Sequence, residues 1–103
     1  MRMMRIYDAF TMKNEGDIQC TNIILAIEFA PDKNAICVSL SDRTIIFFDT
    51  SSANYKVVRK LNVPSTQKCL CYVKRKKMLV SAGTDGAIFA WNLDDIFSNE
   101  FLE

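Results

Sequence analysis

Two aspartates, Asp42 and Asp85, are the first residues in this sequence whose type and spacing could support chemistry. A pair of carboxylates can act as general acid and general base in a hydrolase. The sequence contains no histidine, and neither a nucleophile nor a glycosidase-like context accompanies the pair. Both aspartates also lie in equivalent turns of two similar segments, 43 residues apart. We therefore interpret them as structural turn residues, and we expect a protein that is not an enzyme and needs no cofactor.

The cysteines are a second set of residues with chemical potential. Cys69 and Cys71 would lie on one face of a strand and could form half of a metal site, but no second pair follows at zinc spacing. Together with Cys20 and Cys37 they could also form a disulfide framework. Three of the four lie in apolar runs, and the first ten residues do not resemble a signal peptide. We expect small buried thiols in a reducing, intracellular and cytoplasmic compartment, and no metal.

The strongest local charge is the run Lys74, Arg75, Lys76 and Lys77. Such a loop could bind an acidic protein surface, for example a tubulin tail, or a phosphate group. The alternative, which we favour, is a solvated turn whose charges keep a hairpin tip in water. Because no aromatic residues interleave the charges and the net charge is only +1, nucleic acid is an unlikely partner. No apolar run approaches the roughly 20 residues that cross a bilayer, so we expect no membrane partner.

These residues belong to a sequence that repeats. Residues 35–49, AICVSLSDRTIIFFD, align without a gap with residues 78–92, MLVSAGTDGAIFAWN. Each copy reads as an apolar strand, a short turn, and a second strand rich in β-branched and aromatic residues. Asp85 followed by Gly86 is a strong hairpin signal. Arg43 replaces this glycine in the first copy, so we expect a different type of turn there.

Further elements surround the two hairpins. A shorter strand precedes each of them, at residues 24–29 and 68–72, and a more polar strand at 55–61 follows the first. Residues 4–8 resemble the end of the first copy, and residues 17–21 would form the strand after them. Only the C-terminus predicts a helix, from apolar and polar residues at helical spacing: Leu93, Ile96, Phe97, Glu100 and Phe101.

A period near 43 residues, with hairpins around tight turns, is typical of the blades of a β-propeller. We predict an all-β fold: an incomplete β-propeller with one full four-stranded blade flanked by two partial blades, and a short C-terminal helix. Residues 1–23 would be the last strands of a preceding blade, and residues 24–66 the complete blade. Residues 67–103 would form most of a following blade and a C-terminal tail.

The residues at corresponding blade positions carry a family resemblance. They are Asp42, Phe48 and Asp49 in the first copy, Asp85, Gly86, Trp91 and Asn92 in the second, Tyr7 and Asp8 near the N-terminus, and the turn Phe29-Ala30-Pro31-Asp32. In this pattern the chain resembles the WD-repeat family, whose blades carry an aspartate in a turn and close on Trp-Asp. The resemblance implies a propeller that binds other proteins.

The chain departs from this family in having no histidine, so the Gly-His dipeptide is missing. The family's buried His–Ser/Thr–Asp–Trp network therefore cannot form, and we expect Asp42 and Asp85 to accept hydrogen bonds from turn amides instead. Such repeats, with a Ser-Asp-Arg-Thr turn, also resemble large scaffold proteins of ciliary axonemes that combine EF-hands with WD repeats. That resemblance implies a cytoskeletal or ciliary location, although the sequence has no EF-hand loop.

The length of the chain sets a limit on the propeller. A closed ring of four blades needs on the order of 160 residues, and this sequence has 103. Both terminal faces would expose apolar rows, so we expect other protein chains or missing blades to cover both ends. The predicted function is a non-catalytic WD-repeat scaffold segment that mediates protein–protein interaction. The alternative is a binder of anionic surfaces, acidic protein tails or nucleic acid, through the loop Lys74–Lys77.

Overall fold

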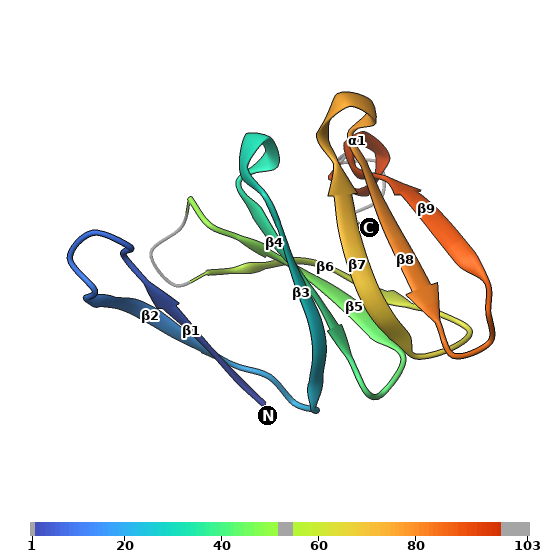
Figure 1. The fold of residues 1–103 in the computed structure, drawn as a ribbon, viewed down its shortest axis with the longest axis horizontal. Helices are drawn as coiled ribbons and strands as arrows, with labels where there is room; N and C mark the ends of the chain where they lie inside the picture. Colours follow the sequence, from blue (N-terminus) through green and yellow to red (C-terminus); the bar gives the residue numbers. More distant parts are fainter. Residues whose placement is uncertain (1, 52–54, 98–103) are drawn as a thin grey trace.

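The fold was examined in a computed structural model, which describes residues 2–51 and 55–97. Nine strands form three antiparallel sheets, which lie side by side in chain order (Figure 1). The strands are β1 (Met3–Tyr7) and β2 (Asn14–Gln19) in the first sheet; β3 (Ile24–Ala30), β4 (Ala35–Leu40), β5 (Thr44–Asp49) and β6 (Val57–Asn62) in the second; and β7 (Gln67–Val73), β8 (Met78–Gly83) and β9 (Ile88–Asn92) in the third. The predicted all-β fold is confirmed.

Short helical turns complete the structure. Two 3₁₀ turns, η1 (Pro31–Lys33) and η2 (Lys74–Lys76), link the first two strands of the second and third sheets. The predicted C-terminal helix begins at Leu93, but α1 (Leu93–Ile96) is only four residues long. Glu100 and Phe101 of the predicted helical stretch lie outside the described residues. Within residues 2–51 and 55–97, no helix is long and apolar enough to cross a membrane.

Strand boundaries follow local turn chemistry. The predicted strands 35–40 and 44–49 coincide with β4 and β5. The strand predicted at 17–21 is instead β2, which begins three residues earlier, at Asn14. The reason is Asp8, whose carboxylate accepts the amide hydrogens of Phe10 at 2.8 Å and Thr11 at 2.9 Å and thereby closes a short loop. The chain therefore returns early enough for Met3 to pair with Gln19.

The two repeated hairpins share one turn geometry, which contradicts the expectation of different turns. Arg43 has φ 63° and Gly86 has φ 80°, and they occupy the same position of the repeat. The amide of Arg43 donates to the carbonyl of Leu40, and the amide of Gly86 donates to the carbonyl of Gly83; both hydrogen bonds measure 3.3 Å. The pairing of the flanking strands thus imposes a left-handed conformation that arginine adopts only at a cost.

The second sheet is the centre of the molecule, because a neighbouring sheet packs against each of its faces. Alternate residues of a strand point to opposite faces, and every residue of β4 is buried. Cys37, Ile45 and Phe47 face the third sheet, where they pack with Leu79. The opposite face of the second sheet packs against Met4 and Ile18 of the first sheet; its buried residues are Ile36, Val38, Leu40, Ile46 and Phe48.

Candidate functional site

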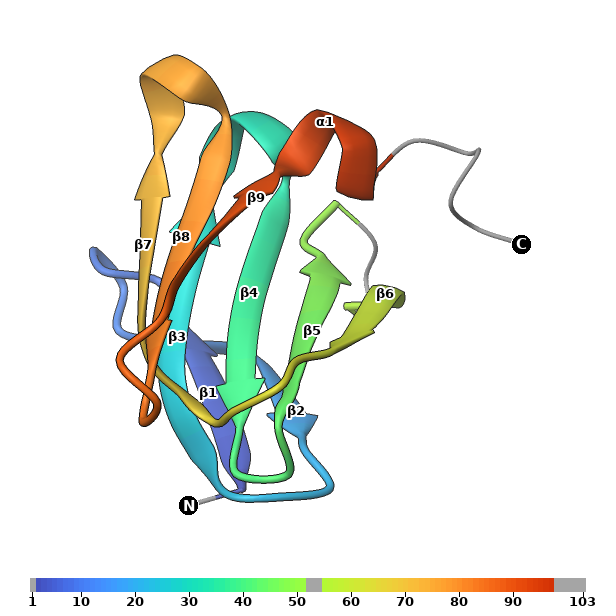
Figure 2. The same cartoon turned by 90° about the vertical axis from the view of Figure 1, so that its right-hand side faces the viewer.

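The side of the third sheet that faces away from the second is apolar across all three strands. One row across the sheet is Cys69, Ala82 and Ile88, and the next is Cys71, Val80 and Ala90. We call these six residues the outer apolar face. Cys69, Cys71, Ile88 and Ala90 are exposed, Ile88 to 72%. Figure 2 views the molecule from the side of the third sheet.

The internal repeat shows what an equivalent face looks like when it is covered. The second-sheet residues 43 positions before Val80, Ile88 and Ala90 are Cys37, Ile45 and Phe47. All three are fully buried, in the cluster that includes residues of the third sheet. A row that is core in the second sheet is therefore left open to solvent in the third.

The first sheet presents a different outer side. Arg5 on β1 lies directly opposite Asp17 on β2, and both are exposed. Opposite charges in this register suit a solvated sheet surface. Met3 and Tyr7, which is 53% exposed, share this side of β1 with Arg5, so the outer side of the first sheet mixes charged and apolar residues, whereas that of the third sheet is apolar.

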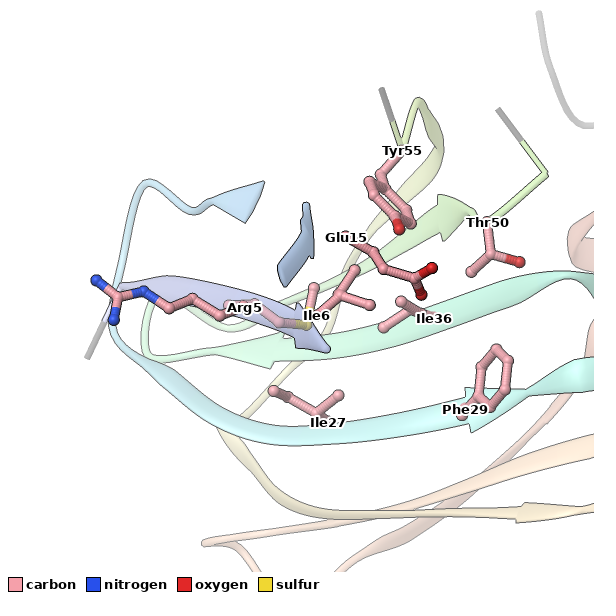
Figure 3. Close-up of a pocket in the computed structure, with 9 residues that line it drawn as sticks. Arg5, Ile6, Glu15, Ile27, Phe29, Ile36, Thr50 and Tyr55 are labelled. Atoms are coloured by element: carbon pink, nitrogen blue, oxygen red, sulfur yellow. The ribbon is translucent and has the colours of Figure 1, made fainter. Parts of the chain in front are cut away.

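A pocket of about 450 Å³ lies between the first and second sheets. Its apolar lining includes Ile6 of β1, Ile27 and Phe29 of β3, and Ile36 of β4. Figure 3 shows these side chains around the pocket, with Tyr55 beside them and the guanidinium of Arg5 pointing away. The apolar lining favours a hydrophobic occupant over a small polar substrate.

The two aspartates first considered as an acid–base pair lie in turns of different sheets. Asp42 accepts hydrogen bonds from the Thr44 hydroxyl at 2.5 Å and from the Asn22 amide group at 3.0 Å. Asp85 accepts the amide hydrogen of Ala87 at 3.1 Å, which lowers the pKa of its carboxyl group. The expectation of bonds from turn amides is therefore confirmed for Asp85 and wrong for Asp42, whose partners are side chains.

The residues that close each copy stabilise the segment that follows. Phe48 is buried between the first and second sheets. The carboxylate of Asp49 accepts hydrogen bonds from the Ser51 hydroxyl at 2.6 Å and amide at 2.8 Å, and its pKa is lowered by them. At the equivalent position, the side-chain oxygen of Asn92 accepts the amide hydrogen of Asp94 at 2.9 Å and so caps α1. An Asp or Asn is favoured there because it satisfies exposed amides.

Trp91, which closes the second copy with Asn92, forms a hydrogen bond that the sequence did not predict. Its indole nitrogen donates to the hydroxyl of Ser81 at 3.0 Å, and Ser81 is fully buried on β8. Without histidine, a tryptophan–serine pair still joins β8 to β9.

A buried polar cluster around Gln67 was missed altogether. The Gln67 amide group donates to the carbonyl of Ser65 at 2.9 Å, and its own backbone carbonyl accepts from the hydroxyl of Ser39. A Cβ atom on Gly83 would approach the Ser65 hydroxyl to 2.5 Å and the Gln67 amide nitrogen to 2.6 Å. The available signal was Gly83 itself, which stands where the first copy has Leu40.

The basic run forms η2 and the residue after it, and all four side chains are exposed. Lys77 forms an ion pair with Asp32 of η1 at 3.4 Å. Asp32 also accepts a hydrogen bond from the Tyr72 hydroxyl at 2.8 Å, which is the main reason that its pKa is lowered. Lys77 therefore helps to hold the second and third sheets together, whereas Lys74, Arg75 and Lys76 are exposed on the turn.

The cysteines divide into two classes. All four thiols, which lie within the described residues, are free; Cys20 and Cys37 are buried, and Cys69 and Cys71 are exposed. The prediction of buried thiols is therefore wrong for Cys69 and Cys71, because no further sheet among the described residues covers the outer apolar face. Across residues 2–51 and 55–97, no group of three potential metal-ligating side chains converges.

No protein-family model matches the sequence, and no curated protein matches it.

Proposed function

We propose that the chain is a non-catalytic segment of a WD-repeat-type β-propeller that mediates protein–protein interaction within a larger assembly. The observation that carries this proposal is the outer apolar face of the third sheet. The second-sheet residues equivalent to Val80, Ala82, Ile88 and Ala90 are all buried, against the third sheet. A contiguous apolar surface of this kind marks an interaction site.

The arrangement of the sheets supports a blade interpretation. The second sheet has four strands in chain order, β3 to β6, and the third has three, β7 to β9. The first sheet has two, β1 and β2, whose sequence resembles the end of a blade. These sheets fall within the predicted divisions 1–23, 24–66 and 67–103. Each sheet would be one blade or part of one, and missing blades or other chains would cover the ends.

Placing two lysines on the outer apolar face tests this proposal. We expect the purified 103-residue chain to self-associate or precipitate, because Ile88 is exposed and Val80 beside it is only half-buried. The Val80→Lys/Ile88→Lys variant should increase the monomeric fraction several-fold, which corresponds to a loss of about 1 kcal/mol in the free energy of association. Analytical ultracentrifugation measures this fraction, and circular dichroism checks that the strand content is unchanged.

The control variant is Asn14→Lys/Gln19→Lys, which adds the same charge at exposed positions of β2. It should leave self-association unchanged, because these residues do not belong to the outer apolar face. A wild-type chain that remains a monomer and melts cooperatively would contradict the proposal.

A second function is favoured by the exposed side chains of Lys74, Arg75 and Lys76. These charges give the chain a means to bind an acidic protein surface, such as a tubulin tail. Binding of this kind weakens as salt screens the charges.

Charge reversal in the loop tests the second function. The Arg75→Glu/Lys76→Glu variant should bind a fluorescent polyglutamate peptide at least about tenfold more weakly, since two attractive contacts become repulsive. Fluorescence anisotropy over a range of salt concentrations measures the affinity. Lys13→Glu/Lys60→Glu is the matched control at exposed lysines outside the loop. Equal losses in the two variants would show that the loop has no specific role.

A further inference from the structure

Two side chains of the second sheet are more exposed than their repeat-equivalents. Ile27 and Phe29 on β3 are 50% and 52% exposed. The residues 43 positions later are Leu70 and Tyr72, which are half-buried and pack against the core between the second and third sheets. The same repeat position is therefore covered in one sheet and open in the other.

The cause is the number of strands in the preceding sheet. Leu70 and Tyr72 face a second sheet with four strands, but Ile27 and Phe29 face a first sheet with only β1 and β2. The repeat makes β1 the equivalent of β5, because residues 4–8 match the end of the first copy. In the second sheet, β5 pairs with β6 on one edge and with β4 on the other.

The edge of β1 that corresponds to the β4 side of β5 has no partner strand among the described residues. The backbone amide of Cys20 donates to the backbone carbonyl of Arg2 at 2.7 Å, so the backbone N–H and C=O groups of Arg2 point toward β2. Polar backbone groups alternate along an antiparallel strand, and those of Met3 and Arg5 therefore point to the open edge. Such an edge can accept an added strand.

The pocket between the first and second sheets lies beside this edge. It measures about 450 Å³, and Ile27, Phe29 and Ile36 contribute to one wall while Ile6 of β1 contributes to another (Figure 3). An added strand can reach this apolar wall only with every second side chain, because alternate residues point to opposite faces. One occupant could therefore pair with the backbone groups at the open edge and also cover the apolar wall of the pocket.

We propose that a two-stranded β-hairpin from outside the described residues adds to the open edge of β1. Its first-paired strand runs antiparallel to β1 and takes the place that β4 has beside β5. Its alternate side chains cover Ile27 and Phe29 and are small or aliphatic, as Ala35, Cys37 and Ser39 are on β4. The described strands are already paired in the three sheets, so they do not supply this hairpin.

The inference deepens the proposed function and rests on it in one respect, since both treat the sheets as equivalent repeats. The two surfaces are nevertheless separate. The hairpin site involves β1 and β3, whereas the outer apolar face belongs to the third sheet. Substitutions in one surface therefore report on one proposal only.

The test uses a peptide of residues 22–42 of this chain, which contains β3 and β4, with Cys37→Ser and a fluorescent label. It is titrated into the full 103-residue chain carrying Val80→Lys/Ile88→Lys, so that self-association through the outer apolar face does not interfere. We expect saturable 1:1 binding, and no binding of a peptide with the same residues in scrambled order. Arg5→Pro should weaken binding at least about tenfold, because it removes an edge amide and one hydrogen bond.

Arg5→Ala is the matched control and should bind as the parent does, because the backbone amide remains. Proline is tolerated on a sheet edge where its nitrogen faces solvent, and circular dichroism verifies the fold. Phe29→Asp changes a half-exposed side chain on the pocket wall and should also weaken binding about tenfold. This variant tests the same site without altering β1.

Three results would overturn the inference. One is no peptide binding at concentrations up to about 1 mM, and another is equal affinity in the Arg5→Pro and Arg5→Ala variants. The third is a dimer of the parent chain that Arg5→Pro dissociates, which would make a second copy the occupant. If one of these results is found while Val80→Lys/Ile88→Lys still reduces self-association relative to wild type, the hairpin inference is wrong but the proposed function is still supported.

Discussion

Replacing Phe47 by alanine should lower the free energy of unfolding by about 3–5 kcal/mol. Phe47 is fully buried between the second and third sheets, and its ring meets that of Phe97 edge-on at a centroid distance of 5.7 Å. The substitution leaves a cavity in a core that both sheets share. Domains of this size have a total stability of about 5–15 kcal/mol, so this loss is a large part of the total. Urea denaturation followed by circular dichroism measures it.

Phe29→Ala is the matched control for this substitution. It removes the same ring from a position that is 52% exposed, so we expect a loss of less than about 1 kcal/mol. Similar losses at the two positions would contradict the assignment of the main core to the contact between the second and third sheets.

At a protein concentration low enough to keep the chain monomeric, two of the four thiols should react rapidly with a disulfide reagent, and two should be protected. Cys69 and Cys71 are exposed on the outer apolar face, whereas Cys20 and Cys37 are buried. Burial, together with the charge of Glu28, raises the pKa of Cys37 from 9.0 to about 12. Its reactive thiolate is then about a thousandfold scarcer than that of an ordinary thiol, in addition to being inaccessible. Burial also raises the pKa of Cys20.

Absorbance at about pH 8 after addition of DTNB measures this reaction. The Cys69→Ala/Cys71→Ala variant should lose the fast phase and keep the slow one. Once a partner covers the outer apolar face, the fast phase of the wild-type chain should also disappear. A single rate for all four thiols would show that the third sheet does not present Cys69 and Cys71 to solvent.

Local signals were sufficient to predict most strands. The alternation of apolar residues around the turn at Asp42 placed β4 and β5 correctly, because a hairpin is specified by its own residues. The boundary of β2 was not predicted, since it depends on the bonds from the loop amides to Asp8. The conformation of Arg43 was also missed, because strand pairing determined it against the residue's own preference.

The candidate surfaces were only partly predictable. The expectation of apolar rows on both terminal faces held for the third sheet only, because the outer side of the first sheet carries the exposed pair Arg5 and Asp17. The sequence pattern of Cys69 and Cys71 is the same as that of a buried strand, and their exposure depends on a neighbouring sheet that no local pattern reveals. The packing of Gly83 against Ser65 and Gln67 is likewise a contact between segments, and Gly83 is its only trace in the sequence.

The difference between the two outer sides limits how copies of this chain can polymerise. A fibre grows when one end of a molecule fits the opposite end of the next, in a contact that repeats without closing. Here the apolar side of Val80 and Ile88 would meet the charged side of Arg5 and Asp17. That contact would strip water from charges without offering them new partners. We therefore expect this charged pair to disfavour end-to-end stacking of copies.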